Sequence, residues 1–534
     1  MAAPCGAARG RWRPCRFCGP RSHGALVPRL AARCPQWSIP GAPQDLSHLF
    51  RLHHGATQRT QERLLPPRRA LPGRPGRRPL ESDQGASFVN ENFEALDAKP
   101  WLPRTFGYLR HIGPGYMQSA MTLGGGTAFA SIFAGAAFGY ELLWVAPLAM
   151  LLGIIVMSAV AYQTLSSGMR PFEAMKVHAG APFAYGWAFS GIASSIIWQF
   201  AQYALASSML VALAESLGYE VSSGAMGAVA LFWCVAVALL YDARPSLVRF
   251  YEKLIKAMVW FIIACFAFVV AKTGVPHPGD LAAGLVPFSI PGENQGVQGI
   301  TLVVSGLAAA VGANMLFVYP YTLRKRGWGR EHRRLARIDL GFGMFLPYAI
   351  AASLMVIASA SIFFYGDPEL FAGKKISPPQ AAAILAAPDR LGPVAGMWVF
   401  GLGIVAMALS SITMQMLCSG FALCEMFNWE PRGWRYRLGL MLPAVGVLGS
   451  VFWSDVRLWI AVPTNVICGF LLPIAYLGFI KLQLSRDYLG ADRPRGVAGA
   501  LWILGMLVST LVLVGFLGWF TWNQVPHWWQ ELHS

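Results

Sequence analysis

The chain has 534 residues, of which 55% are hydrophobic and only 13% are charged. Soluble globular domains carry about 25% charged residues, so this composition excludes a soluble fold and predicts an all-α polytopic membrane protein. The formal net charge of +17 does not indicate a nucleic-acid partner, because 15 arginines and only two acidic residues fall within residues 1–80. The lipid bilayer is therefore the expected partner.

Residues 1–95 are rich in Pro, Gly and Arg and show no hydrophobic periodicity, so we predict a disordered N-terminal segment. An arginine-rich, acid-poor composition is also typical of an organellar transit peptide. A translation start assigned too far upstream explains the same composition equally well. Both interpretations place the folded transmembrane domain at 105–524, followed by a short extracytoplasmic tail at 525–534.

From residue 105 onward, eleven apolar stretches are long enough to cross a bilayer as helices. They are 108–135, 140–165, 183–213, 222–241, 250–273, 297–322, 338–365, 393–425, 438–454, 458–480 and 498–522. The connections after the even-numbered spans hold 20 Lys and Arg residues, whereas the opposite connections hold five. Because cytoplasmic loops carry the excess of Lys and Arg, this alternation predicts a cytoplasmic N-terminus and a C-terminus on the other side of the membrane. That membrane is a plasma or inner membrane, or an organellar one.

Two of these spans contain residues that interrupt a helix. The first carries GPG at 113–115 and GGGT at 124–127, and each Gly inside a helix costs about 1 kcal/mol relative to Ala. The sixth contains Gly312, the polar Asn314 and Pro320. Broken spans five positions apart are typical of transporters built from two inverted five-helix repeats, which bind the substrate between them. Close helix packing is the alternative explanation for such glycines, but it accounts less well for three in a row.

The stretch GPGYMQSAMTLGGGTAFASIFAGAAFGYELLWV, which begins at residue 113, resembles the first span of the Nramp (natural resistance-associated macrophage protein) divalent metal transporters. That span begins with GPG, carries DPGN and ends in G-x-x-FGY-x-LLWV. Similar segments are LGPVAGMWVFGLGIVAMALSSITMQ, RLGLMLPAVGV and PTNVICGFLLPIAYL, so the resemblance covers about residues 108–490. It implies a LeuT-like fold of two inverted five-helix repeats with broken first and sixth helices.

The resemblance also implies where the substrate binds, although the site motifs have changed. The family's DPGN falls on residues 124–127, so Gly124 replaces a metal-binding Asp and Thr127 replaces a metal-binding Asn. The family's A-x-x-MPH begins at Ala309, so Gly312 replaces the Met and Asn314 replaces the His.

Three further positions follow from the same resemblance. The acidic D-x-x-E pair that moves protons falls on Gln199 and Gln202, the tenth-span Gln corresponds to Asn465, and a ninth-span Arg corresponds to Arg437. The spacing of Gln199 and Gln202 keeps both amides near one helix face. There they either line a polar pathway, to which Arg437 would also belong, or form interhelical hydrogen bonds.

The remaining groups favour a hard cation that is bound weakly. Transition metals select soft or imidazole ligands, and a divalent ion favours carboxylates, whereas this site offers neutral hydroxyl, amide and carbonyl oxygens. We therefore predict a hydrated, Mg²⁺-like substrate rather than Mn²⁺ or Fe²⁺, with Thr127 and Asn314 as candidate metal ligands. Because Gln199 and Gln202 cannot titrate, we also predict transport without proton coupling.

Two other functions stay open at this point. A carrier of a small neutral or zwitterionic organic solute would bind its carboxylate at the half-helix N-terminus near residue 124. A membrane sensor that does not transport would have the site filled by side chains. The chain has no HExxH, G-x-S-x-G or P-loop motif, so neither an enzyme nor a cofactor is expected.

Overall fold

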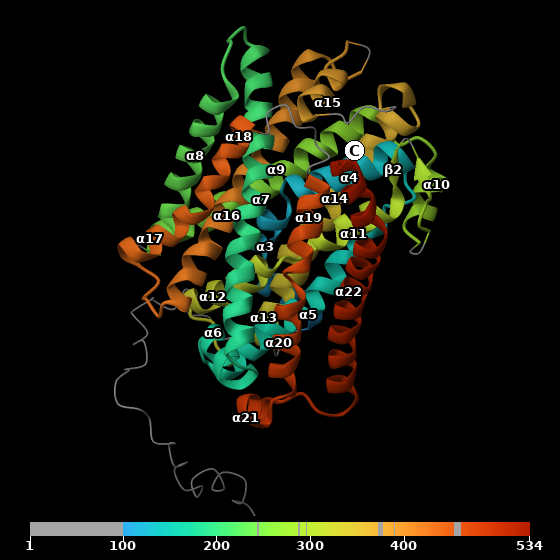
Figure 1. Ribbon diagram of the computed structural model, residues 1–534. Helices are drawn as coiled ribbons and strands as arrows, with labels where there is room; N and C mark the ends of the chain where they lie inside the picture. The colour runs from blue at the N-terminus through green and yellow to red at the C-terminus, as the bar shows by residue number, and fades with distance from the viewer. Residues whose placement is uncertain are drawn as a thin grey trace, which may run out of the picture. The chain divides into compact units, whose positions relative to one another are not determined.

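The computed structural model describes residues 100–533 except 243–244, 287–288, 295, 372–376, 389 and 453–460. The segment 1–95, predicted to be disordered, lies outside the described residues, as does residue 534. Within the described part, the chain is helical apart from its connections and one small antiparallel sheet, in which β1 (Glu293–Asn294) pairs with β2 (Val297–Gln298) (Figure 1).

The first half of the domain begins with a short helix, α2 (Trp101–Leu109), and continues with five spans. The first span consists of two helices, α3 (Pro114–Thr122) and α4 (Gly125–Phe138). The second to fifth spans are α5 (Val145–Ser167), α7 (Ala181–Glu215), α8 (Ser223–Leu240) and α9 (Pro245–Thr273). Their connections contain α6 (Pro171–Ala174), the π-helix η1 (Met175–Ala179) and α10 (Pro278–Gly284).

The second half repeats this order. The sixth span is α11 (Gly299–Ala310) with α12 (Ala313–Lys325), and the seventh comprises α13 (Arg333–Ile338), η3 (Asp339–Phe345), α14 (Leu346–Ser359) and η4 (Ala360–Phe364). The eighth span is η6 (Ala395–Val399) with α16 (Phe400–Met426). The ninth comprises α17 (Gly433–Met441), η7 (Leu442–Leu448) and α18 (Gly449–Phe452). The tenth is α19 (Ala461–Phe470) with α20 (Pro473–Leu484). Short helices in the connections include α15 (Pro378–Leu385) and α21 (Arg486–Leu489).

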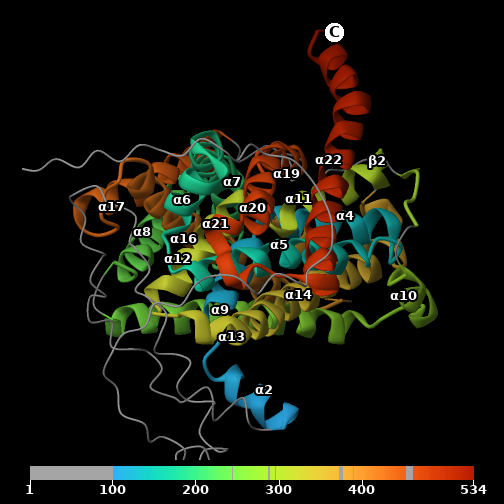
Figure 2. The ribbon, with the colours of Figure 1, turned by 90° about the horizontal axis from the view of Figure 1, so that it is seen from below.

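The last helix, α22 (Gly496–His533), forms the eleventh span. It packs along α5 and α20 at the margin of the bundle in Figures 1 and 2. Both α8 and α22 are largely unburied, so most of their apolar side chains face lipid. The residues predicted as a separate tail, 525–533, continue α22 as helix.

In the described part of the chain, nine helices are long and apolar enough to cross a bilayer, and the bent pair α3–α4 makes a tenth span if it is counted as one. These correspond to ten of the eleven predicted spans. The ninth, predicted at 438–454, differs because its middle is the 3₁₀-helix η7 between two short α-helices. Pro443 has no N–H to donate near the start of η7. Glycines bring this span very close to α7: a Cβ added at Gly449 would lie 2.2 Å from the Phe200 carbonyl oxygen.

Both predicted helix breaks are present, and each lies inside the bundle. Helices α3 and α4 are bent by 58° at their break, where Gly124 is extended, with φ −126° and ψ −170°. Between α11 and α12, Val311 and Gly312 are extended as well. The four half-helices are almost entirely buried, and their neighbours include α5, α7, α14, α16 and α19.

The N-terminus of α3 is held by a buried carboxylate from the seventh span. The two carboxylate oxygens of Asp339 accept hydrogen bonds from the Gly113 N–H at 2.8 Å and the Gly115 N–H at 2.7 Å. The Tyr319 hydroxyl donates a third bond at 3.1 Å. Because the first N–H groups of a helix have no partner within it, Asp339 fixes the entry of the chain into the first span.

Gly135 shows that some glycines of the first span do serve close packing. A Cβ added there would lie 2.2 Å from the Val356 carbonyl oxygen of α14. We expect Gly135→Ala to lower the free energy of unfolding by about 1–3 kcal/mol, because overpacking forces neighbouring backbone apart. The midpoint of thermal unfolding in detergent measures this. Gly518→Ala on α22 is the control, because a Cβ there meets nothing within 4 Å; equal midpoints would contradict the prediction.

Candidate functional site

The break in the first span is capped by a side chain from another helix. Gly124 is the N-cap residue of α4 and has no side chain to offer, so the Gly125 N–H donates to Gln202 Oε1 of α7 at 2.8 Å. Gln202 Nε2 donates to Ser411 Oγ of α16 at 3.1 Å, and Ser411 donates to the Met121 carbonyl of α3 at 2.8 Å. One glutamine thus supplies the cap that the N-terminus of α4 requires and joins it to two other spans.

A pair of threonines connects the two breaks. The Thr127 hydroxyl donates to the Thr122 carbonyl at 2.6 Å, across the bend between α3 and α4. The Thr122 hydroxyl donates to the carbonyls of Ala309 and Ala310, at 3.0 and 2.9 Å, where α11 ends. These three carbonyl groups at the interruptions are therefore bonded to hydroxyl groups, as a low-dielectric interior requires.

Asn465 of α19 joins α4 to α11. Its Nδ2 donates to the Gly126 carbonyl at 3.2 Å and to Ser305 Oγ at 2.7 Å. The carbonyl acceptor identifies the donating atom as the amide nitrogen, so Oδ1 is the free end of the side chain. It is fully buried and has no hydrogen-bond partner among the described residues. A Cβ at Gly126 would lie 2.3 Å from this oxygen and 2.5 Å from the Trp198 ring.

Asn314 lies at the second break. Its Oδ1 accepts a hydrogen bond from the Met315 N–H at 2.9 Å, over the first turn of α12. A Cβ added at Gly312, the N-cap residue, would lie only 2.4 Å from that oxygen. Gly312 is therefore required wherever Asn314 folds back on the N-terminus of α12.

Three buried glutamines extend the network along the α7–α16 interface. Gln199 Nε2 donates to the Ile412 carbonyl at 3.1 Å, and Gln415 Nε2 donates to Ser411 Oγ at 3.2 Å. The Oε1 atoms of both have no hydrogen-bond partner in the described part of the chain. Gln199 and Gln202 thus form interhelical hydrogen bonds in this conformation.

Most of the predicted site residues come together, but Arg437 does not. Its Nε donates to Asp242 Oδ2 at 3.0 Å, and its side chain is 60% exposed. It belongs to an ion pair at the end of the bundle in this conformation, and its place in a polar pathway stays a prediction. Arg437 lies in α17, the first helix of the ninth span. The sequence resemblance alone does not fix which residue of this helix aligns with the family's Arg.

Sequence reasoning missed three residues that bond the breaks together: Thr122, Ser305 and Gln415. Each is a polar residue within an apolar span, which is the only signal the sequence carries. Such residues often bond to the preceding turn of their own helix, so the signal does not separate them from ordinary buried serines and threonines.

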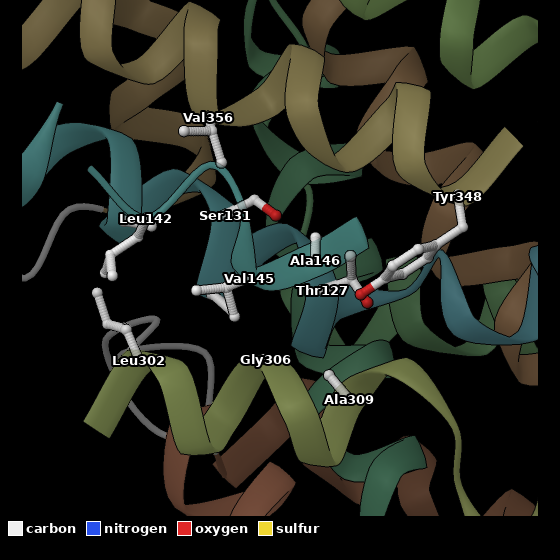
Figure 3. A pocket seen from close by; sticks show the side chains of 12 residues that line it. Thr127, Ser131, Leu142, Val145, Ala146, Leu302, Gly306, Ala309, Tyr348 and Val356 are labelled. Atoms are coloured by element: carbon white, nitrogen blue, oxygen red, sulfur yellow. The ribbon is translucent and has the colours of Figure 1, made fainter. Parts of the chain in front are cut away.

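A small cavity lies beside the first break, between α4, α5, α11 and α14 (Figure 3). About 20 Å³ is open to the centre of a water molecule, enough for one ordered water. The hydroxyl groups of Thr127, Ser131 and Tyr348 line it, and the other lining residues are apolar. This space is too small for a hydrated ion or an amino acid.

The chemistry of the site is neutral and based on oxygen. In the described ranges, no three His, Cys, Asp or Glu side chains lie close enough to hold a metal ion together. The buried acidic residues of this part of the chain, Asp339 and Glu425, lie at helix ends with partners of their own. The groups at the breaks are amides, hydroxyls and backbone carbonyls.

The chain matches known proteins over most of its length. A curated relative, the divalent metal cation transporter MntH of Mycobacterium tuberculosis, is 25% identical over 423 residues, which cover 76% of this chain and 91% of the relative. The metal transporter Nramp6.2 of Populus trichocarpa is 24% identical over 450 residues, covering 78% and 77%.

The fold matches a solved structure, a manganese transporter of Eremococcus coleocola, with a TM-score of 0.63 at 16% identity over 83% of this chain and 92% of the other. The broken first and sixth spans and the inverted five-helix repeats are those of this fold. The model of the family described as natural resistance-associated macrophage protein-like matches residues 115–518. The chain therefore belongs to the Nramp family.

Proposed function

We propose that the chain is a membrane transporter that moves a divalent metal cation, which keeps much of its water and crosses without proton coupling. Membership of the Nramp family and the relatives named as divalent metal cation transporters support the metal cation. The hydrated form and the absence of coupling rest on the groups at the two breaks.

One observation carries the choice of a hard cation. Two amides near the first break have their donor ends occupied: Asn465 Nδ2 bonds to Gly126 and Ser305, and Gln415 Nε2 bonds to Ser411. What remains is oxygen, at Asn465 Oδ1 and Gln415 Oε1, both buried without a partner among the described residues. Neutral oxygens suit a hard cation, and their lack of charge favours an ion such as Mg²⁺ that keeps its water.

Proton coupling requires a group that titrates within the pathway. Gln199 and Gln202 lie at the interface of α7 with α16, and amides do not titrate. Asp339 accepts three hydrogen bonds at the N-terminus of α3. Glu425 forms an ion pair with Arg170, in which the carboxylate Oε2 lies 2.5 Å from the guanidinium Nη2. Their positions support structural roles for both carboxylates.

Metal uptake into proteoliposomes tests the substrate. We expect Mg²⁺ uptake by the wild type, with Mn²⁺ moved less efficiently. Thr127→Val and Asn314→Ala should each weaken the apparent affinity about tenfold, because losing an oxygen ligand worth about 1.4 kcal/mol has that effect. Asn523→Ala, an exposed amide on α22, is the matched control. If no divalent cation moves, or if both site variants match the control, the proposed function is wrong.

A proton gradient tests the coupling. With metal at equal concentration on both sides, an inward proton gradient should drive no accumulation, and metal entry should not acidify the lumen. This is measured with a metal tracer and a pH-sensitive dye inside the vesicles. Accumulation driven by the gradient would overturn the uncoupled mechanism, and its loss in Asp339→Asn or Glu425→Gln would identify the proton carrier.

A sensor that does not transport is the second candidate, and one observation favours it. The space at the first break is filled by Gln202, Trp198 and Asn465, and the adjoining cavity has room for about one water. The organic-solute carrier is less well supported, because Gln202 already occupies the Gly125 N–H that a substrate carboxylate would need. The sensor would be favoured if no cation is transported but added metal still raises the thermal unfolding midpoint of the protein.

We further propose that the N-terminus lies in the cytoplasm and the C-terminus outside, in a plasma, inner or organellar membrane. The alternation of 20 against five Lys and Arg residues supports this orientation. An epitope placed after residue 534 should be labelled by antibody in intact cells if the protein is at the cell surface, or in intact isolated organelles only after permeabilisation. For protein at the cell surface, labelling that requires permeabilisation would reverse the orientation.

A further inference from the structure

We infer that Gln202 determines which ligands the first-span break can hold, because its amide occupies the place of a side chain at position 124. Residues 124 and 202 then act as one unit: an acidic side chain can enter the break only if Gln202 is shortened. The consequence for transport rests on the proposed function, whereas the consequence for metal binding does not.

The geometry leaves no room for both side chains. A Cβ added to Gly124 would lie 2.2 Å from Gln202 Nε2 and 2.7 Å from Ser411 Oγ. At the neighbouring Gly125, the nearest atom to such a Cβ is Leu205 Cδ2 at 3.2 Å. The severe conflict with Gln202 therefore falls on position 124.

Gln202 cannot easily move aside. Its side chain is fully buried, and both ends of the amide are bonded, Oε1 to the Gly125 N–H and Nε2 to Ser411 Oγ. Turning it away would leave an N–H of α4 without a partner in a buried setting, which is strongly unfavourable in proteins. Ser411 is less restrictive, because its Oγ would lie 2.7 Å from the added Cβ and its hydroxyl can turn about one bond by giving up its hydrogen bond to the Met121 carbonyl.

The chemical consequence is a choice between two kinds of site. With the Gln202 amide present, the N-terminus of α4 is capped by a neutral group and the break presents only neutral oxygens. A carboxylate at position 124 would add a negative charge at the positive end of a 14-residue helix. We expect a break with that charge to bind a partly dehydrated Mn²⁺ or Cd²⁺ more tightly than the neutral oxygens of the wild type do.

Binding of Mn²⁺ to the purified full-length protein in detergent tests this inference, with Gly124→Asp, Gln202→Ala and the combination G124D/Q202A. We expect Mn²⁺ to bind the combination at least tenfold more tightly than the wild type or either single variant. G124N/Q202A has the same shape without the charge, and G124D/Q163A removes a different buried glutamine, one that bonds to Phe479 and Gln483. Both should resemble the wild type. Tight binding by Gly124→Asp alone, or equal binding by G124N/Q202A, would overturn the inference.

A second measurement does not depend on metal and applies if the acidic variants fold poorly. Gly124→Ala introduces only the Cβ, so it should lower the thermal unfolding midpoint more in the wild type than in the Gln202→Ala background. Additive shifts in G124A/Q202A would show that the two positions are independent, and the inference would fail.

The outcomes also separate this inference from the proposed function. If the wild type moves no cation but G124D/Q202A gains Mn²⁺ affinity, the transport proposal fails and the role of Gln202 stands. If the wild type moves Mg²⁺ and the combination gains no Mn²⁺ affinity, the role of Gln202 fails and the transport proposal stands.

Discussion

The structure depends on bonding the backbone groups that two interrupted helices release inside an apolar bundle. An unbonded N–H or carbonyl at that depth costs several kcal/mol, so irregular backbone is tolerated only where protein groups satisfy it. Here Gln202, Thr122 and Asn465 do so, and each reaches from one span to another. The same bonds that allow the breaks therefore hold α4, α7, α11, α16 and α19 together.

This constraint explains how neutral side chains can maintain both breaks. Gly124, with no side chain, leaves the N-terminus of α4 uncapped, and a glutamine from α7 restores the cap. Gly312 similarly leaves space that the Asn314 side chain occupies. In both cases a neutral amide fills the position, so the helix ends stay bonded while the charge and the soft ligands are absent.

Sequence reasoning predicted the features that follow from local physics. The apolar lengths gave ten spans that the structure contains, and runs such as GGGT at 124–127 located both interruptions. The 3₁₀ helix η7 and the surface position of Arg437 could not be predicted, because they depend on how closely the ninth span approaches α7. The meeting of Gln202 with Gly124 joins residues 78 positions apart, which no local pattern encodes.

The two breaks form a single hydrogen-bonded unit rather than two independent hinges. The Thr122 carbonyl accepts hydrogen bonds from the Gly124 N–H and the Thr127 hydroxyl. The Thr122 hydroxyl donates to the carbonyls of Ala309 and Ala310. A movement of α3 away from α11 must break the bonds made by this hydroxyl. A movement of α4 away from α7 must instead release Gln202 from Gly125. The two movements therefore break different, identifiable sets of bonds, and both sets are intact beside the small cavity at Thr127.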